Sequence, residues 1–168
     1  MIKFAKLAIV VVLGTVLAIT ALLTGQPGAE LPPGEDGRVV RVVDGDTVQV
    51  EVAGQSYRVR YIGVDAPEST RQTECFGREA AAFNRKLVAG QHLRLERDVN
   101  ETDRYGRLLR YAYLLDGRMV NEVLVREGYA LARSYPPDVK YQERLRAAER
   151  DARSAGRGLW GVCPNVRP

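Results

Sequence analysis

Histidine and cysteine are scarce in this chain of 168 residues, which contains one His and two Cys. His92 has no second His and no Cys nearby in the sequence to complete a metal site, and the spacing of Cys75 and Cys163 matches no zinc-binding pattern. The chain also contains no internal repeat. These absences argue against a zinc module and leave His92 as an ordinary surface or half-buried strand residue.

The chain also lacks a large excess of either charge sign. The chain has 25 Lys and Arg residues against 21 Asp and Glu residues, which gives a formal net charge of +4 and a pI near 9.2. This mildly basic balance is compatible with a polyanionic partner but does not require one. The length allows one domain with a sizeable core plus an appendage.

The first 24 residues are predicted to be a signal peptide or an N-terminal membrane anchor. Lys3 and Lys6 precede an apolar run over 7–23 that contains no charged residue. The run is at the lower edge of a membrane span and longer than a typical signal core, and no clean Ala-x-Ala cleavage site follows. Both alternatives stay open, and both export the domain, to an extracellular or periplasmic location or to the outer face of the cytoplasmic membrane.

Residues 25–37 are rich in Pro and Gly and are predicted to be a linker, followed by a folded domain over 38–162 and a tail over 163–168. Alternating apolar residues predict five strands in the domain, and apolar residues three and four apart predict three helices. The expected strands cover 38–43, 48–52, 57–61, 93–95 and 108–115, and the expected helices cover 76–87, 119–127 and 141–155. The pattern indicates an α+β fold that is mainly β, with a mainly antiparallel sheet, and it fits a small closed barrel of the oligonucleotide-binding (OB) type.

Acidic residues gather at the hairpin over 46–65. Asp46 opens one strand and Asp65 follows the end of its partner, so an antiparallel pairing brings the two carboxylates together. Two close carboxylates repel each other unless a cation lies between them, and oxygen ligands suit a hard divalent cation such as Ca²⁺. Arg60 adds a planar cation suited to phosphate. On spacing alone, turn aspartates and a solvated arginine are the alternative.

Four segments in order resemble the staphylococcal nuclease (thermonuclease) family. The first is Asp-Gly-Asp-Thr at 44–47 with Arg60, Asp65 and Pro67-Glu68 after the hairpin. The others are the helix segment at 79–83, Asp-Arg-Tyr-Gly-Arg at 103–107, and the helix segment at 119–125. The resemblance covers about residues 38–160 and implies a five-stranded OB-fold barrel.

The resemblance also implies roles for individual residues. It implies that Asp46, Asp65 and the backbone carbonyl of Ala66 bind Ca²⁺, although the family often has threonine at the last position. It implies that Glu68 orients or deprotonates the attacking water and that Arg60 and Arg107 bind phosphate. Tyr105 matches an aromatic residue near the nucleotide, and Tyr135 is a candidate for a second one.

These roles describe a calcium-dependent nuclease that cleaves DNA and RNA with little sequence preference and leaves 3′-phosphate ends. The alternative is a non-catalytic module that binds nucleic acid. The chain keeps the two aspartates, both arginines and the glutamate together, which favours the enzyme. The expected partners are DNA and RNA as substrates and, if the first segment is retained, the membrane. A monomer is expected, although the sequence does not fix the oligomeric state.

Cys75 and Cys163 could be core residues, a metal pair or a disulfide. Because the domain is expected to be exported into an oxidising compartment, we predict a disulfide between them. This bridge would tie the tail to the start of the first helix.

Overall fold

The computed structural model describes residues 35–70, 72–164 and 166. The predicted signal or anchor over 1–24 and most of the predicted linker lie outside the described residues. Within these ranges, no helix is long and apolar enough to cross a membrane.

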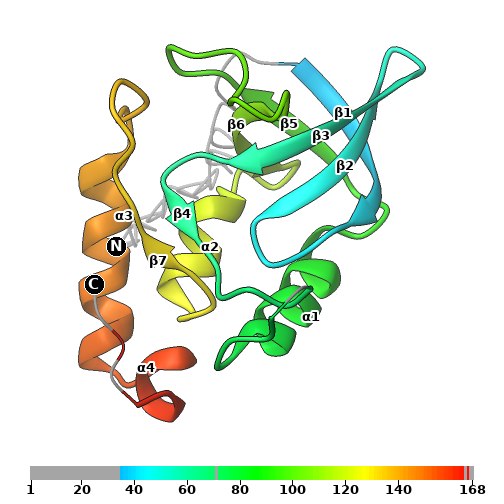
Figure 1. Ribbon diagram of the computed structural model, residues 1–168. Helices are drawn as coiled ribbons and strands as arrows, with labels where there is room; N and C mark the ends of the chain where they lie inside the picture. The colour runs from blue at the N-terminus through cyan, green and yellow to red at the C-terminus, as the bar shows by residue number, and fades with distance from the viewer. Residues whose placement is uncertain (1–34, 71, 165, 167–168) are drawn as a thin grey trace, which may run out of the picture.

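Five strands close into a barrel in the order β1-β2-β3-β6-β5 (Figure 1). They are β1 (Glu35–Val42), β2 (Thr47–Val52), β3 (Gln55–Tyr61), β5 (His92–Glu96) and β6 (Leu108–Leu114). Neighbouring strands pair antiparallel except β3 and β6, which pair parallel. The predicted five-stranded closed barrel is therefore confirmed.

Period-2 alternation decides which side chains fill the barrel. Val48, Val50 and Val59 are fully buried, whereas Arg58 is exposed. The β2–β3 hairpin turns at Ala53 and Gly54, both of which have positive φ angles, the geometry that matches the twist of a two-residue hairpin. This alternation directs the arginines of β3 outward.

Strand β1 begins three residues before the predicted domain boundary at residue 38. Residues 35–37 pair with β5, Glu35 opposite Leu95 and Gly37 opposite Leu93. They belong to the Pro- and Gly-rich segment that was predicted to be a linker, but the ladder to β5 makes them part of a strand. The first strand thus includes the last three residues of the segment predicted to be a linker.

The three predicted helices are present as α1 (Gly77–Val88), α2 (Val120–Arg126) and α3 (Gln142–Ser154). Figure 1 shows α1 beside one end of the barrel, while α2 lies between α3 and the barrel and contacts both α3 and β6. A short helix α4 (Leu159–Val162) and a two-stranded sheet of β4 (Val64–Asp65) and β7 (Leu131–Ala132) complete the described fold.

A disulfide joins Cys75 to Cys163, which are 88 positions apart in the sequence. Cys75 lies just before α1 and Cys163 just after α4, so the bridge ties the end of the chain to the start of the first helix. It is the pairing that the sequence analysis predicted.

Candidate active site

Strand pairing brings the two predicted carboxylates together. Thr47 lies opposite Arg60 in the β2–β3 ladder, so Asp46 sits at the end where β3 continues toward β4. The Arg60 guanidinium lies between the two groups, with Nη1 3.0 Å from Oδ2 of Asp46 and Nη2 3.2 Å from Oδ1 of Asp65. The structure therefore places these three residues at one point, with an arginine as the cation between the carboxylates.

Asp46 is a buried carboxylate, with 7% of its surface exposed. The Thr47 hydroxyl donates to its Oδ1 at 3.0 Å, and the Ala66 backbone N–H donates to its Oδ2 at 2.9 Å. Burial raises the pKa of Asp46 to about 7, against the opposing effect of Arg60. A carboxylate held in this way favours any additional positive charge nearby. The contact that Ala66 makes to Asp46 uses its N–H group, which leaves the predicted role of its carbonyl as a hypothesis.

A cavity of about 330 Å³ opens at these groups, and its lining is strongly acidic. Five carboxylates and two arginines face it. They are Asp44, Asp46, Asp65, Glu68 and Glu74, with Arg60 and Arg107. Neither Asp44 nor Glu74 was a predicted site residue. Asp44 belongs to the Asp-Gly-Asp-Thr turn, whereas Glu74 lies in a polar loop whose sequence did not indicate a functional residue.

Glu68 lies on a loop that its own carboxylate organises. Its Oε1 accepts from the backbone N–H of Ser69 at 2.8 Å and from the N–H and hydroxyl of Thr70 at 2.7 and 2.6 Å. The Glu68 N–H donates to Oε2 of Glu74 at 3.0 Å, and the Glu74 N–H donates back to the Glu68 carbonyl at 2.9 Å. These bonds fix the Glu68 side chain at the wall of the acidic cavity.

Arg107 is held by Asp103, a residue whose role the motif did not reveal. The Arg107 Nε donates to Oδ2 of Asp103 at 2.7 Å, and its Nη1 reaches Oγ1 of Thr47 at 3.5 Å. Burial alone would raise the pKa of Asp103, but hydrogen bonds from Arg107 and from the Tyr105 backbone outweigh it and hold the pKa below its usual value. Asp103 therefore stays ionised and orients the guanidinium.

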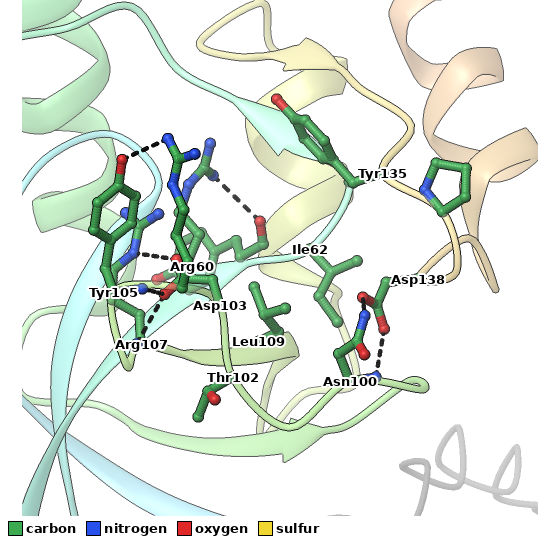
Figure 2. Close-up of a pocket in the computed structure, with 14 residues that line it drawn as sticks. Arg60, Ile62, Asn100, Thr102, Asp103, Tyr105, Arg107, Leu109, Tyr135 and Asp138 are labelled. Atoms are coloured by element: carbon green, nitrogen blue, oxygen red, sulfur yellow. Dashed lines mark hydrogen bonds and ion pairs between the residues drawn. The ribbon is translucent and has the colours of Figure 1, made fainter.

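A larger cavity of about 530 Å³ shares Arg60 and Arg107 with the acidic one. Tyr105 and Tyr135 both line it, together with Ile62 and Leu109. In Figure 2, Tyr105 lies beside Arg107 at one end of this cavity and Tyr135 at the other. The cavity thus combines aromatic rings and apolar side chains with three arginines, two of which it shares with the acidic cavity, and this suits a nucleoside attached to a phosphate.

A side chain of helix α1 holds the Asp-Gly-Asp turn in place through a hydrogen bond. The buried Asn84 amide donates to the Asp44 carbonyl at 2.9 Å and accepts from the Tyr61 hydroxyl at 3.3 Å. A Cβ added at Gly45 would lie 2.5 Å from Cβ of Ala66, so only glycine allows this approach. Asn84 was detectable in the sequence as a polar residue four positions after Ala80 on the apolar stripe of the helix.

The donor set of the acidic cavity fits a hard divalent cation. The side chains in its lining that could bind a metal are carboxylates, and no His or Cys lines it. Oxygen ligands of this kind are the ones that hard cations prefer. Within the part of the chain that the structure describes, no group of three or more His, Cys, Asp or Glu side chains is close enough together to hold a metal ion. Asp46 and Asp65 could therefore supply two ligands, and the remaining positions would fall to backbone, water or phosphate oxygens.

Comparison with known proteins agrees with this geometry. A family model described as staphylococcal nuclease homologue matches residues 58–162. The chain belongs to the staphylococcal nuclease family. It is 41% identical over 126 residues to a thermonuclease of Staphylococcus hyicus, covering 73% of this chain and 74% of that protein. It is 40% identical over 130 residues to the thermonuclease of Staphylococcus intermedius, covering 76% and 77%.

A third relative is the endonuclease YncB of Bacillus subtilis, 40% identical over 125 residues that cover 71% of this chain and 59% of that protein. The matched range of the staphylococcal nuclease family model contains Arg60, Asp65, Glu68 and Arg107. It also contains Tyr105, Tyr135 and Cys75, whereas Cys163 directly follows it. Asp46 precedes that range and joins the site through strand pairing.

Proposed function

We propose that this member of the family is a calcium-dependent nuclease that hydrolyses phosphodiester bonds of DNA and RNA with little sequence preference. The observation that carries the proposal is the convergence of Arg60, Arg107 and Glu68 on one acidic cavity beside an aromatic one. The matches to the relatives cover most of the folded part of the chain. The relatives are named as nucleases, which supports the same reaction.

The phosphate would lie between the two arginines, which both cavities share. Guanidinium groups bind phosphate oxygens through paired hydrogen bonds and stabilise the negative charge that develops in the transition state. Arg60 is held by Asp46 and Asp65, and Arg107 by Asp103, so both are oriented before substrate binds. Pre-orientation lowers the cost of organising the site during the reaction.

Glu68 would act on the water that attacks phosphorus. Its carboxylate reaches the acidic cavity from a loop fixed by the hydrogen bonds of Ser69 and Thr70. A carboxylate there can orient a water molecule and accept its proton. The nucleoside next to the cleaved bond would occupy the larger cavity against Tyr105 and Tyr135 by stacking, which depends little on the identity of the base.

A calcium ion would be held by Asp46, Asp65 and the carbonyl of Ala66. Bound there, such an ion polarises a phosphoryl oxygen and offsets its charge. The donor chemistry of the cavity supports this assignment, because oxygen ligands favour hard cations.

The test is cleavage of single-stranded DNA and of RNA by the purified full-length chain, with Ca²⁺ and with chelator. We expect cleavage of both polymers with Ca²⁺, with 3′-phosphate ends, and none with chelator. Glu68→Gln serves as the control for contaminating nucleases. Activity that survives chelator contradicts the metal assignment, and binding without cleavage favours the non-catalytic module.

We also propose export of the domain. The apolar run over 7–23 supports it, and the Cys75–Cys163 disulfide suits an oxidising compartment. Protease treatment of intact cells is the test. We expect an exported domain, anchored or released, to be digested or found in the medium, whereas full protection inside the cytoplasm would contradict export.

A further inference from the structure

The outer face of the barrel beside the site carries two arginines that the proposed chemistry does not use. Arg58 lies on β3 and Arg41 on β1, and both are exposed. Among the described residues, neither guanidinium has a hydrogen-bond or ion-pair partner. An arginine without a partner on an ordered strand can bind an anion without first breaking an existing pair.

Strand register places these arginines in one row. Gln49 of β2 lies opposite Arg41 on one side and opposite Arg58 on the other. Directly opposed residues of antiparallel strands project to the same face of a sheet, so all three side chains point out of the barrel. Because neighbouring strands lie about 4.8 Å apart, the backbones of the two arginines are roughly 10 Å apart. We call Arg41, Gln49 and Arg58 the arginine row.

The row begins one step from the site. Arg58 and Arg60 are two positions apart on β3, share its outer face and lie about 6.7 Å apart along the strand. On the other side of Arg60, Ile62 lines the larger cavity. Arg107 directly precedes Leu108, which pairs with Val59 of β3. The row therefore extends the cationic site across the barrel, away from the larger cavity.

Acidic residues lie on both sides of the row, in the acidic cavity at one side and at Glu51 on the other. Glu51 faces Ser56 and Arg38 in the next outward-facing row, two residues further along β2 from Gln49. Toward the site, the corresponding row consists of Thr47 and Arg60. At the site, Arg60 is paired with Asp46 and Asp65, so the row carries the unpaired positive charge between the acidic cavity and Glu51.

We propose that the arginine row binds the phosphates of a polynucleotide strand beyond the bond that is cleaved, so that long substrates are preferred over short ones. This inference rests on the proposed function and adds a binding surface to it. A strand with one nucleoside in the larger cavity and its phosphate at Arg60 would continue across β3, β2 and β1. Arginine suits this task because its planar fork matches phosphate oxygens and needs no base-specific contact.

The test compares Arg41→Gln/Arg58→Gln with the unaltered chain on two substrates, a dinucleotide and a single strand of about 12 nucleotides. Arg150→Gln is the matched control, because Arg150 is also exposed but lies on α3. We expect the double variant to lose kcat/KM severalfold on the long strand and to remain within about twofold on the dinucleotide. The control should lose nothing on either.

Binding of the same long strand to each protein in the Glu68→Gln background gives a readout that does not need cleavage. The binding constant K falls as salt rises, and losing two phosphate contacts should make the slope of log K against log salt shallower by about 1.4, at ~0.7 per contact for single strands. An unchanged slope, or equal losses on both substrates, overturns the row as a polynucleotide surface. If the unaltered chain cleaves neither substrate, the proposed function fails. The salt dependence of binding still shows whether the arginine row contacts phosphates.

Discussion

At the scale of single residues, the site depends on side chains that are oriented by other side chains. Asp103 fixes Arg107, Thr70 and Ser69 fix Glu68, and Asn84 fixes the turn at Asp44. Each of these supports is a hydrogen bond to a charged side chain or, at Asp44, to a backbone carbonyl, and none of the supported groups is an apolar core side chain. Substitution of a functional group should therefore affect the reaction far more than stability.

Glu68→Gln should cut turnover by about 10²–10³-fold, the usual cost of losing a well-placed electrostatic contact in the transition state. The amide keeps the shape of the side chain and can still accept from the Thr70 and Ser69 N–H groups. We therefore expect a melting temperature within a few degrees of the unaltered protein. Turnover on single-stranded DNA and thermal unfolding measured on the same sample check both parts, and near-full activity would remove Glu68 from the mechanism.

At the scale of elements, the first turn of α1 presses against the loop that carries Glu68. A Cβ added at Gly77 would lie 2.1 Å from the Glu68 carbonyl oxygen, a backbone atom that cannot move alone. Gly77 is thus required for close approach between helix and loop. This contact couples the position of the helix to the position of the proposed water-orienting group.

Gly77→Ala should therefore displace the Glu68 loop. We expect the free energy of unfolding to fall by about 1–3 kcal/mol, as for other overpacked sites, and turnover to fall more than the affinity for nucleic acid. The control is Arg78→Ala at the next position of the helix, which is exposed. Urea unfolding and steady-state kinetics provide the measurement, and equal behaviour of the two variants would contradict the coupling.

A buried arginine of β6 makes the barrel sensitive to acid. Arg110, with 1% of its surface exposed, pairs with Glu101 and lies 3.4 Å from Oε2 of Glu35. Hydrogen bonds from Arg110 and Arg97 lower the pKa of Glu101 below its usual value. A carboxyl group with a lowered pKa stabilises the fold fully above its unfolded-state pKa, and that contribution is lost as the pH falls through the folded-state pKa.

Glu101→Gln should consequently make the free energy of unfolding depend less on pH in the acid range. We expect the variant to lose about 1 kcal/mol at neutral pH, because Glu101 is half exposed, and to lose less additional stability than the unaltered protein as the pH falls below about 4. Urea unfolding at a series of pH values measures this. Glu143→Gln, at an exposed position of α3, is the control and should keep the original pH profile.

At the scale of the whole molecule, the sequence predicted the barrel and most of the residues that gather at the site. Local alternation identified the strands, and antiparallel pairing was enough to bring Asp46 next to Asp65. The extra strand residues at 35–37 were missed because their pairing with β5 depends on a strand more than 50 positions away. Glu74 and Asp103 were missed for another reason: each bonds to a site residue within six positions of it, but the loop sequence does not show which groups will pair.

The disulfide links two parts of the molecule that are distant in the sequence. Cys75 follows Glu74, which is bonded to the Glu68 backbone, and Cys163 ends α4. Because the bridge closes a loop with a sequence separation of 88, it removes much of the entropy of the unfolded chain. The chemistry uses no sulfur, so the bridge should matter more for stability than for catalysis.

Reduction, or Cys75→Ser/Cys163→Ser, should therefore lower the free energy of unfolding by about 2–4 kcal/mol while turnover well below the melting temperature changes much less. Thiol titration of the unfolded, unreduced protein should find no free cysteine. Melting curves with and without reductant measure the stability, and the double serine variant is the control because its curve should not respond to reductant. If the unaltered protein also melts at the same temperature with and without reductant, the bridge does not stabilise the fold. A loss of turnover as large as that of Glu68→Gln would instead show that the bridge positions the Glu68 loop for the reaction.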